Sequence, residues 1–314
     1  MEYRTLGGSG LRVSLVGLGC NNFGRRIDYT ASQPVVLKAL DLGITLFDTA
    51  DVYRSPIGGS EEFLGRALGP RRKDIVLATK VSMPMNDSQR GAARQIIMAS
   101  VEASLRRLNT DWIDLYQQHQ PDSLTPIEET LRAFDDLIRQ GKVRYIGCSN
   151  QRAWQVVEAR WTSRTLGLAP FVSCQDEYSL LARHADRELI PMMQACGMGL
   201  LPYYPLASGA LTGKYRRNTS MPDGARLTVH AARYGDRFLN DATWPILEEL
   251  EEFAEARGRT LLELAFGWLA ARPCVSSIIA GATKPEQLAV NVHAVEWALT
   301  PEDLREIDRI TAAE

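Results

Sequence analysis

The sequence lacks the features that define several classes of protein. It has no run approaching the roughly 20 apolar residues of a membrane-spanning helix, and its first residues lack the basic-then-apolar layout of a signal peptide. Because 36 Lys and Arg face 38 Asp and Glu, the net charge is −2, which offers no electrostatic basis for binding a nucleic acid. We therefore expect a cytoplasmic protein that binds neither a membrane nor a nucleic acid.

Cysteine and histidine are scarce. The cysteines are odd in number and never form a C-x-x-C pair: Cys20, Cys148, Cys174, Cys196 and Cys274. We interpret them as reduced, buried thiols rather than as catalytic nucleophiles. Beside His119, the remaining histidines are too dispersed to suggest a ligand set, so the sequence predicts no metal site: His184, His230 and His293.

Neither common nucleotide fingerprint is complete. The stretch 17–22 has the first two glycines of G-x-G-x-x-G, but Asn22 replaces the third glycine, which the close helix–strand packing of a Rossmann turn requires. The stretch 208–215 resembles a phosphate-binding loop, but it lacks the first glycine and the final Ser or Thr. A Rossmann domain and a P-loop NTPase are therefore not predicted.

Strand-like and helix-like patterns alternate along the 314 residues. Eight candidate strands are spaced regularly: 15–18, 44–47, 75–79, 113–117, 144–148, 171–174, 199–202 and 275–279. Helical patterns lie between them: 32–42, 60–68 (with Ser60 as N-cap), 93–108, 126–140, 152–164, 186–196, 244–256, 260–272 (capped by Thr260) and 285–294. Alternation predicts a parallel sheet, and eight units predict an α/β fold of the closed (β/α)8 TIM barrel type. A doubly wound open sheet is the alternative, but it uses fewer strands.

Two elements frame this barrel. A turn-rich cluster at 7–10 separates the short apolar segments 3–6 and 12–15, which predicts an N-terminal β-hairpin. A further helix, 301–311, follows the last barrel helix. We expect a single domain over 1–314. The long polar stretch 213–240 has little helical pattern and is the candidate for a functional lid.

Four side chains that can polarise and protonate a carbonyl lie at or beside predicted strand ends. Asp48, Lys80 and His119 each end an apolar run, and Tyr53 follows Asp48 by five residues. The carboxyl ends of parallel barrel strands are where catalytic groups lie. Any one of these residues alone is more commonly a solvated cap or ion pair, but four on one rim predict an active site.

The motifs that carry these residues resemble those of the aldo-keto reductase superfamily. They occur in order along almost the whole chain: Asp48-Thr-Ala-x-x-Tyr53, Thr79-Lys80, Asp114-Leu-Tyr-Gln-Gln-His119, Gly147-Cys-Ser149-Asn150, Gln175-Asp-Glu-Tyr178, Tyr203-Tyr-Pro205-Leu206-Ala-Ser208-Gly209 and Gly281-Ala-Thr283-Lys-x-x-Gln287-x-x-x-Asn291. The resemblance implies a (β/α)8 barrel that binds NADP(H) without a Rossmann fold and reduces aldehydes or ketones.

The resemblance also implies a role for each catalytic residue. Tyr53 is the general acid, Lys80 is the cation that stabilises its phenolate, Asp48 keeps Lys80 charged, and His119 hydrogen-bonds the carbonyl oxygen. An ammonium about 4 Å from the hydroxyl supplies on the order of 4 kcal/mol at an effective dielectric constant of about 20. We therefore expect Lys80 to lower the pKa of Tyr53.

By the same resemblance, a long series of residues contacts NADP(H). Those expected at the nicotinamide end are Asn21, Asp48, Ser149, Asn150, Gln175 and Tyr203. Those expected along the pyrophosphate and adenosine are Pro205, Leu206, Ser208, Gly209, Leu211, Lys214, Arg226, Gly281, Thr283, Gln287 and Asn291. Gln287 stands where relatives close to aldose reductase carry an arginine for the 2′-phosphate, so NADP(H) is favoured and NAD(H) is the alternative.

The expected substrate is a small aldehyde or ketone. Its pocket is expected to be lined by Phe23, Tyr53, Met83, His119 and Gln120, together with Asn21, Met85 and the 213–240 stretch. Because few residues follow the last helix, we expect a pocket that accepts a broad range of carbonyls. We also expect a monomer.

Two other functions share these features. Potassium-channel β subunits resemble the chain in fold and motifs, so an NADP(H)-binding sensing subunit with little turnover is one alternative. The absence of an N-terminal extension before the predicted barrel argues against this alternative. The other is a barrel enzyme that uses Lys80 to form a Schiff base, which would need no nicotinamide cofactor.

Overall fold

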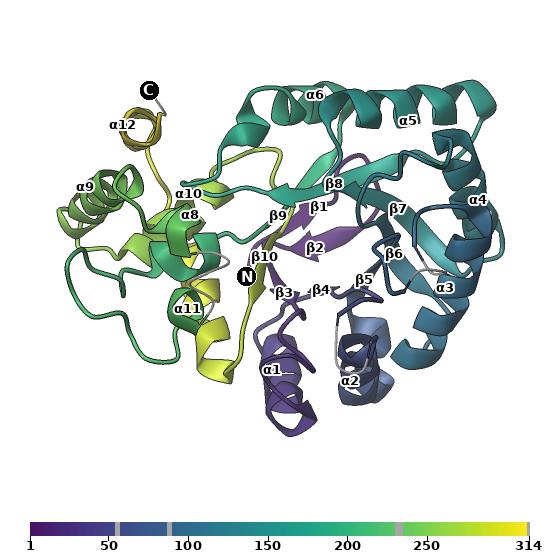
Figure 1. The fold of residues 1–314 in the computed structure, drawn as a ribbon, viewed down its shortest axis with the longest axis horizontal. Helices are drawn as coiled ribbons and strands as arrows, with labels where there is room; N and C mark the ends of the chain where they lie inside the picture. Colours follow the sequence, from purple (N-terminus) through teal and green to yellow (C-terminus); the bar gives the residue numbers. More distant parts are fainter. Residues whose placement is uncertain (54–56, 87–89, 230–234, 313–314) are drawn as a thin grey trace.

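Eight parallel strands form a nearly closed barrel inside a ring of helices (Figure 1). This computed structural model describes residues 1–53, 57–86, 90–229 and 235–312. The strands follow the order β10-β3-β4-β5-β6-β7-β8-β9, and their bounds are β3 (Val16–Gly19), β4 (Leu46–Asp48), β5 (Val76–Val81), β6 (Ile113–Gln118), β7 (Val143–Ser149), β8 (Phe171–Glu177), β9 (Gly199–Tyr203) and β10 (Ile278–Gly281). The predicted (β/α)8 fold is confirmed.

The barrel closes through Leu200 of β9. Its backbone N–H donates to the carbonyl of Cys274 over 2.7 Å, and its carbonyl accepts from the N–H of Ser276 over 2.9 Å. Because these bonds precede β10, the two strands are joined near their beginnings.

The helices that surround the barrel lie close to the predicted ranges. They are α1 (Tyr29–Asp41), α2 (Gly59–Leu68), α3 (Arg94–Leu108), α4 (Ile127–Arg139), α5 (Ala153–Leu166), α6 (Leu189–Cys196), α9 (Thr243–Glu255), α10 (Leu261–Ala270) and α11 (Pro285–Ala294). The predicted additional helix is α12 (Pro301–Thr311), which packs beside α9 (Figure 1). Three 3-10 segments, which the sequence patterns did not indicate, are η1 (Gly69–Asp74), η2 (His184–Asp186) and η3 (Ala207–Thr212).

The cap predicted for α10 is confirmed, whereas the cap predicted for α2 is wrong. Thr260 accepts from the N–H of Glu263 and forms a capping box with it. Ser60, in contrast, lies inside α2, which follows Gly58 in a left-handed conformation (φ 82°). The Ser60 hydroxyl instead donates to the carbonyl of Cys20 over 2.8 Å. It therefore ties α2 to the segment that follows β3.

The predicted N-terminal hairpin is also confirmed and packs on one end of the barrel. Strands β1 (Tyr3–Thr5) and β2 (Arg12–Ser14) pair in an antiparallel arrangement. Leu6 and Val13, from the hairpin, belong to the same buried cluster as barrel residues, among them Leu46, Leu115 and Leu201. The hairpin therefore buries apolar surface at the amino ends of the strands, and the predicted catalytic residues lie at the opposite end.

The stretch predicted as a lid has more helix than its sequence pattern indicated. Within 213–240 the structure contains α7 (Arg226–Val229) and α8 (Asp236–Phe238), and residues 230–234 lie outside the described part of the chain. In the residues that the structure describes, no helix has the length and apolar character needed to span a membrane.

Candidate active site

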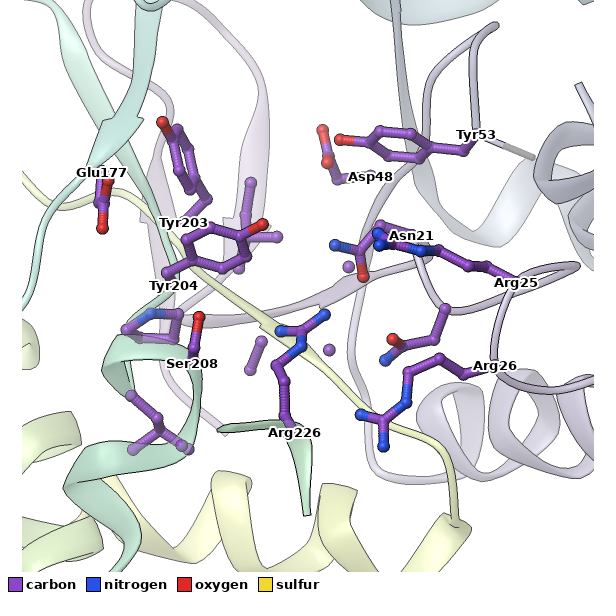
Figure 2. Close-up of a pocket in the computed structure, with 18 of the residues that line it drawn as sticks. Asn21, Arg25, Arg26, Asp48, Tyr53, Glu177, Tyr203, Tyr204, Ser208 and Arg226 are labelled. Atoms are coloured by element: carbon purple, nitrogen blue, oxygen red, sulfur yellow. The ribbon is translucent and has the colours of Figure 1, made fainter. Parts of the chain in front are cut away.

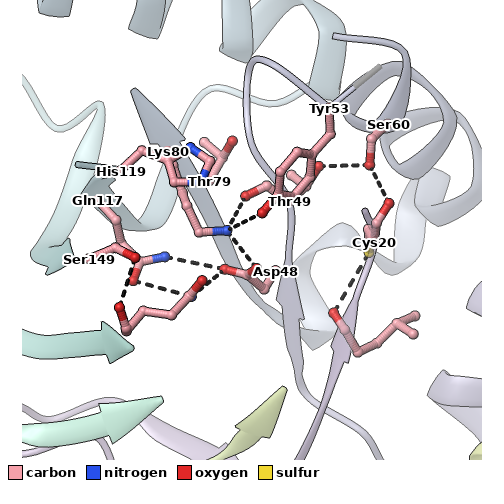
Figure 3. Close-up of polar contacts among 12 residues, drawn as sticks. Cys20, Asp48, Thr49, Tyr53, Ser60, Thr79, Lys80, Gln117, His119 and Ser149 are labelled. Carbon is pink, nitrogen blue, oxygen red and sulfur yellow. Dashed lines mark hydrogen bonds and ion pairs between the residues drawn. The ribbon is translucent and has the colours of Figure 1, made fainter. Parts of the chain in front are cut away.

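A buried ion pair lies where β4 and β5 end. The Lys80 ammonium is 2.6 Å from Asp48 Oδ2 and also donates to the carbonyl of Thr49 over 2.9 Å (Figure 3). The Lys80 side chain is completely buried and Asp48 is 3% exposed. Removing two charges from water is costly unless they are paired and hydrogen-bonded, and here both conditions hold.

Two glutamines satisfy the second oxygen of Asp48. Gln117 Nε2 donates to Asp48 Oδ1 over 3.2 Å and Gln175 Nε2 donates to it over 2.8 Å. Gln117 comes from β6 and Gln175 from β8, so side chains from two other strands hold the carboxylate. The sequence did not predict Gln117 as a site residue, because its contact with Asp48 depends on which face of β6 points into the barrel.

The Tyr53 hydroxyl lies beside the same ammonium. Lys80 Nζ donates to Tyr53 Oη over 3.4 Å (Figure 3), and the tyrosine ring packs edge-on against His119 with ring centroids 5.7 Å apart. The four residues that were expected to act together are therefore neighbours in the structure: Asp48, Tyr53, Lys80 and His119.

The pKa of Tyr53 differs from the sequence-based expectation. Burial penalises the phenolate more than the Lys80 charge favours it, so the pKa of Tyr53 is raised. Burial also acts on Lys80 and by itself lowers its pKa, but the attraction of Asp48 and the hydrogen bonds to Asp48 and Tyr53 outweigh burial and raise the pKa of Lys80. Tyr53 therefore stays protonated and Lys80 stays charged, which is the state that a proton donor requires.

His119 is an uncharged imidazole at the edge of this group. Burial, and then the Lys80 charge, hold the pKa of His119 well below its usual range. Its Nδ1 atom is buried and has no hydrogen-bond partner among the described residues. The His119 backbone is fixed from both sides, because its N–H donates to the carbonyl of Val81 and its carbonyl accepts from Asn150 Nδ2.

This lowered pKa predicts a pH dependence of stability. The unfolded chain binds a proton on His119 below about pH 6.5 and the folded chain does not, so the free energy of unfolding falls as the pH drops through that value. We expect this contribution to approach 1.4 kcal/mol per pH unit and to be absent from His119→Gln. Urea unfolding of both proteins at pH 7.5 and at lower pH measures it; equal pH slopes would contradict a neutral buried His119.

A cavity of about 880 Å³ opens over these residues. Most of the residues expected to contact cofactor or substrate line it: Asn21, Asp48, Tyr53, Met83, His119, Ser149, Asn150, Gln175, Tyr203, Pro205, Leu206, Ser208, Gly209, Lys214, Arg226, Gly281, Thr283 and Gln287. Lys80 lies beneath the cavity surface, where it reaches Tyr53 and Asp48.

Five expected residues do not line this cavity. Phe23 and Leu211 are completely buried core residues, and Asn291 of α11 is 5% exposed. The carbonyl of Gln120 instead accepts from the Ser82 hydroxyl, and Met85 is also outside the lining. The direction of each of these side chains depends on the packing around it, which sequence position does not give.

Other residues line the cavity without having been predicted. Among them are charged or aromatic side chains: Arg25, Arg26 and Tyr204 come from loops, and Glu177 ends β8, while Arg237 of α8 belongs to the 213–240 stretch that was expected to line the pocket but was not named individually. Figure 2 shows Arg25 and Arg26 on the wall opposite Tyr203, Tyr204 and Ser208. The sequence did contain a signal for two of them, because the neighbouring cations Arg25 and Arg26 follow the end of a predicted barrel strand.

The wall formed after β9 has an unusual backbone. Tyr204, Ala207 and Ser208 have positive φ values of 53°, 46° and 58°, a region that side chains rarely adopt and that is common at ligand-binding sites. The buried Ser208 Oγ has no partner among the described residues, and neither has the buried Asn22 Oδ1. Both residues line the cavity, so their unsatisfied polar atoms suit a polar ligand.

Comparisons with known proteins agree with this geometry. The family model described as "Aldo/keto reductase family" matches residues 15–312. A probable voltage-gated potassium channel subunit beta from Arabidopsis thaliana is 37% identical, with 99% of this chain and 96% of the relative covered. An uncharacterized oxidoreductase from Bacillus subtilis is 36% identical with the same coverage. The L-glyceraldehyde 3-phosphate reductase of Escherichia coli O157:H7 is 33% identical, with 98% of this chain and 92% of the relative covered. The chain belongs to the aldo/keto reductase family.

Proposed function

We propose that this protein reduces aldehydes and ketones to alcohols with NADPH, and that Tyr53 donates the proton. Membership of the aldo/keto reductase family supports an oxidoreductase that acts on carbonyl compounds. The observation that carries the finer proposal is the Lys80 ammonium, which lies 2.6 Å from Asp48 and 3.4 Å from the Tyr53 hydroxyl at the floor of the cavity.

The residues around the cavity fit a nicotinamide dinucleotide. Ser149, Asn150 and Gln175 supply hydroxyl and amide groups at one end, where they are already linked: the Ser149 hydroxyl donates to the carbonyl of Gln175, and Asn150 Nδ2 donates to Ser149 Oγ. The Ser208 hydroxyl, which has no partner among the described residues, and the Lys214 ammonium belong to the wall that suits phosphates. NADPH, when bound, supplies the hydride for the carbonyl carbon.

The protein's own groups would then manage the charge that develops on the carbonyl oxygen. In this mechanism the His119 imidazole donates a hydrogen bond to that oxygen and orients it, as an oxyanion-hole donor does. The Tyr53 hydroxyl transfers its proton to the alkoxide, which is a stronger base than a phenolate. The Lys80 ammonium stabilises the resulting phenolate, and Asp48, held by Gln117 and Gln175, keeps Lys80 in place.

Consumption of NADPH tests this function directly. Purified protein is incubated with NADPH or NADH and an activated aldehyde such as 4-nitrobenzaldehyde, and absorbance at the nicotinamide band is followed. A panel of small aldehydes and ketones, including L-glyceraldehyde 3-phosphate because one relative is named for it, then defines the breadth of the pocket. Loss of NADPH that depends on the carbonyl supports the proposal, whereas no binding of either nucleotide would refute it.

A second candidate is an NADP(H)-binding regulatory subunit. The observation in its favour is that relatives from rice and Arabidopsis, 36% and 37% identical, are described as probable potassium channel β subunits. Tight binding of NADPH with no turnover across the whole carbonyl panel would support this candidate over the reductase.

A further inference from the structure

Ser82, the second residue after Lys80, has a backbone conformation that no other described residue with a side chain shares. Its φ is 99°, whereas the other non-glycine residues with positive φ in the described part of the chain have values between 46° and 58°. Those values belong to the left-handed helical region, in which a side chain is tolerated, but 99° lies outside it. Ser82 is also 1% exposed. A strained residue persists only where its surroundings hold it, and such residues cluster at functional sites.

The Ser82 hydroxyl holds both backbone polar groups of Gln120. Ser82 Oγ donates to the carbonyl oxygen of Gln120 over 3.0 Å and accepts from its N–H over 3.1 Å. One hydroxyl can make both bonds, because it has one proton and two lone pairs. Gln120 directly follows His119. The contact therefore joins the chain that leaves β5 to the chain that leaves β6, beside His119.

The position of the His119 ring depends on its backbone. The His119 N–H donates to the carbonyl of Val81 over 2.7 Å, and its carbonyl accepts from Asn150 Nδ2 over 2.9 Å. The buried Nδ1 atom of the ring, in contrast, has no hydrogen-bond partner among the described residues. The ring is therefore held by its own backbone and by its packing against Tyr53. A shift of the peptide groups around His119 would move the imidazole.

The strained φ does not by itself explain why a serine stands at this position. Ser82 turns the chain from the end of β5 to Met83, which lines the cavity, and its carbonyl accepts from the N–H of Gly91 over 3.1 Å. A glycine would adopt the same φ without strain. What a glycine lacks is the hydroxyl that binds Gln120, so this contact is the feature that the strain accompanies.

We propose that Ser82 is a positioning residue for His119: its hydroxyl fixes the Gln120 peptide groups, and these hold the imidazole at the place where a carbonyl oxygen is to be bound. Ser82 does not line the cavity, so it acts through His119 rather than on substrate or cofactor. The inference rests on the proposed function, in which His119 orients the carbonyl. It accounts for a strained serine where glycine would be the less strained choice.

Two substitutions at this position separate the hydroxyl from the strain. Ser82→Ala removes the hydroxyl and keeps the strained φ, whereas Ser82→Gly removes both. We expect kcat for aldehyde reduction to fall by about 10–100-fold in both variants, with the Kd for NADPH unchanged. Ser82→Gly is expected to unfold at a higher urea concentration than Ser82→Ala, because glycine adopts this φ freely. Activity would then not follow stability, as it would if Ser82 served stability alone.

Ser14→Ala is the matched control. Ser14 is completely buried, and its hydroxyl likewise donates to a carbonyl, that of Val16 over 2.7 Å, and accepts from an N–H, that of Thr45 over 2.9 Å. It lies at the amino end of the barrel, away from the site. We expect Ser14→Ala to lose stability and to keep the wild-type kcat. In a His119→Ala background, Ser82→Ala is expected to cause no further loss of kcat, because Ser82 acts through the imidazole.

The titration of the His119 imidazole reports its position without any turnover. The chain has four histidines, so selectively labelled rings can be followed by NMR, and the His119 signal is the one that His119→Ala removes. Burial and then the Lys80 charge hold the pKa of His119 well below its usual range. We expect both Ser82 variants to move this pKa toward about 6.5, since a loosened ring gains access to water, and Ser14→Ala to leave it unchanged.

Each result decides for or against the proposal. A wild-type kcat, or a His119 titration that does not move, in either Ser82 variant would overturn it. So would an equal loss of kcat in Ser14→Ala, or a further loss from Ser82→Ala in the His119→Ala background. If the wild type binds NADPH but reduces no carbonyl, the proposed function fails, and the His119 titration alone then decides whether Ser82 positions the ring.

Discussion

Tyr53→Phe is expected to lower kcat for aldehyde reduction by about 10²–10⁴-fold while leaving the affinity for NADPH nearly unchanged. The substitution removes only the hydroxyl that lies 3.4 Å from Lys80 Nζ. It leaves the ring that packs edge-on against His119. Because burial raises the pKa of Tyr53, we expect the phenol to hold its proton until an alkoxide forms. Among the described residues, no other hydroxyl contacts Lys80.

Steady-state kinetics and cofactor titration measure the two parts of this expectation separately. Tyr29→Phe is the control, since it removes a tyrosine hydroxyl outside the cavity lining and retains the ring contact with Phe63. If Tyr53→Phe kept activity within a few-fold of the wild type, the acid would have to be another group. A loss of NADPH binding in the same variant would instead indicate a role in cofactor binding.

Lys80→Met is expected to cost about 3–5 kcal/mol of folding stability as well as activity. The ammonium is completely buried and is 2.6 Å from Asp48 Oδ2. Its removal leaves a buried carboxylate whose remaining donors, among the described residues, are the amide groups of Gln117 and Gln175. An unpaired buried charge is far less favourable than either the intact pair or no pair at all.

The double variant Asp48→Asn/Lys80→Met distinguishes the charge effect from the loss of packing. We expect it to be more stable than Lys80→Met, because no charge then remains buried, and to be equally inactive. Arg132→Met is the surface control: Arg132 and Glu128 form an exposed pair at 2.9 Å on α4, for which a change of at most about 1 kcal/mol is expected. Chemical unfolding of all four proteins makes the comparison. A double variant less stable than Lys80→Met would refute this account of the pair.

Several features of the site could be predicted before the structure was considered. Asp48, Lys80 and His119 each end an apolar run, and the carboxyl ends of parallel strands meet at one end of a barrel. Their convergence therefore followed from local pattern alone. Tyr53 follows Asp48 by five residues, and the hydrogen bond from Lys80 to the Tyr53 hydroxyl places it at the same end of the barrel.

Other features depended on distances that no local pattern contains. Phe23 was expected in the substrate pocket but is part of the core, because the loop after β3 turns its ring inward and its arginines toward the cavity. The pKa of Tyr53 was expected to fall and instead rises, since the sequence revealed the nearby cation but not the depth of burial.

The sequence by itself determined the order of strands and helices, the (β/α)8 class and the rim on which the chemistry lies. These follow from the periodicity of apolar residues and from the convergence of strand ends, both of which are local or topological. Only the tertiary structure decided that Gln117 and Gln175 hold Asp48 and that Ser60 ties α2 to the segment after β3. These contacts join residues far apart in the chain, so they depend on how the helices and loops pack in three dimensions.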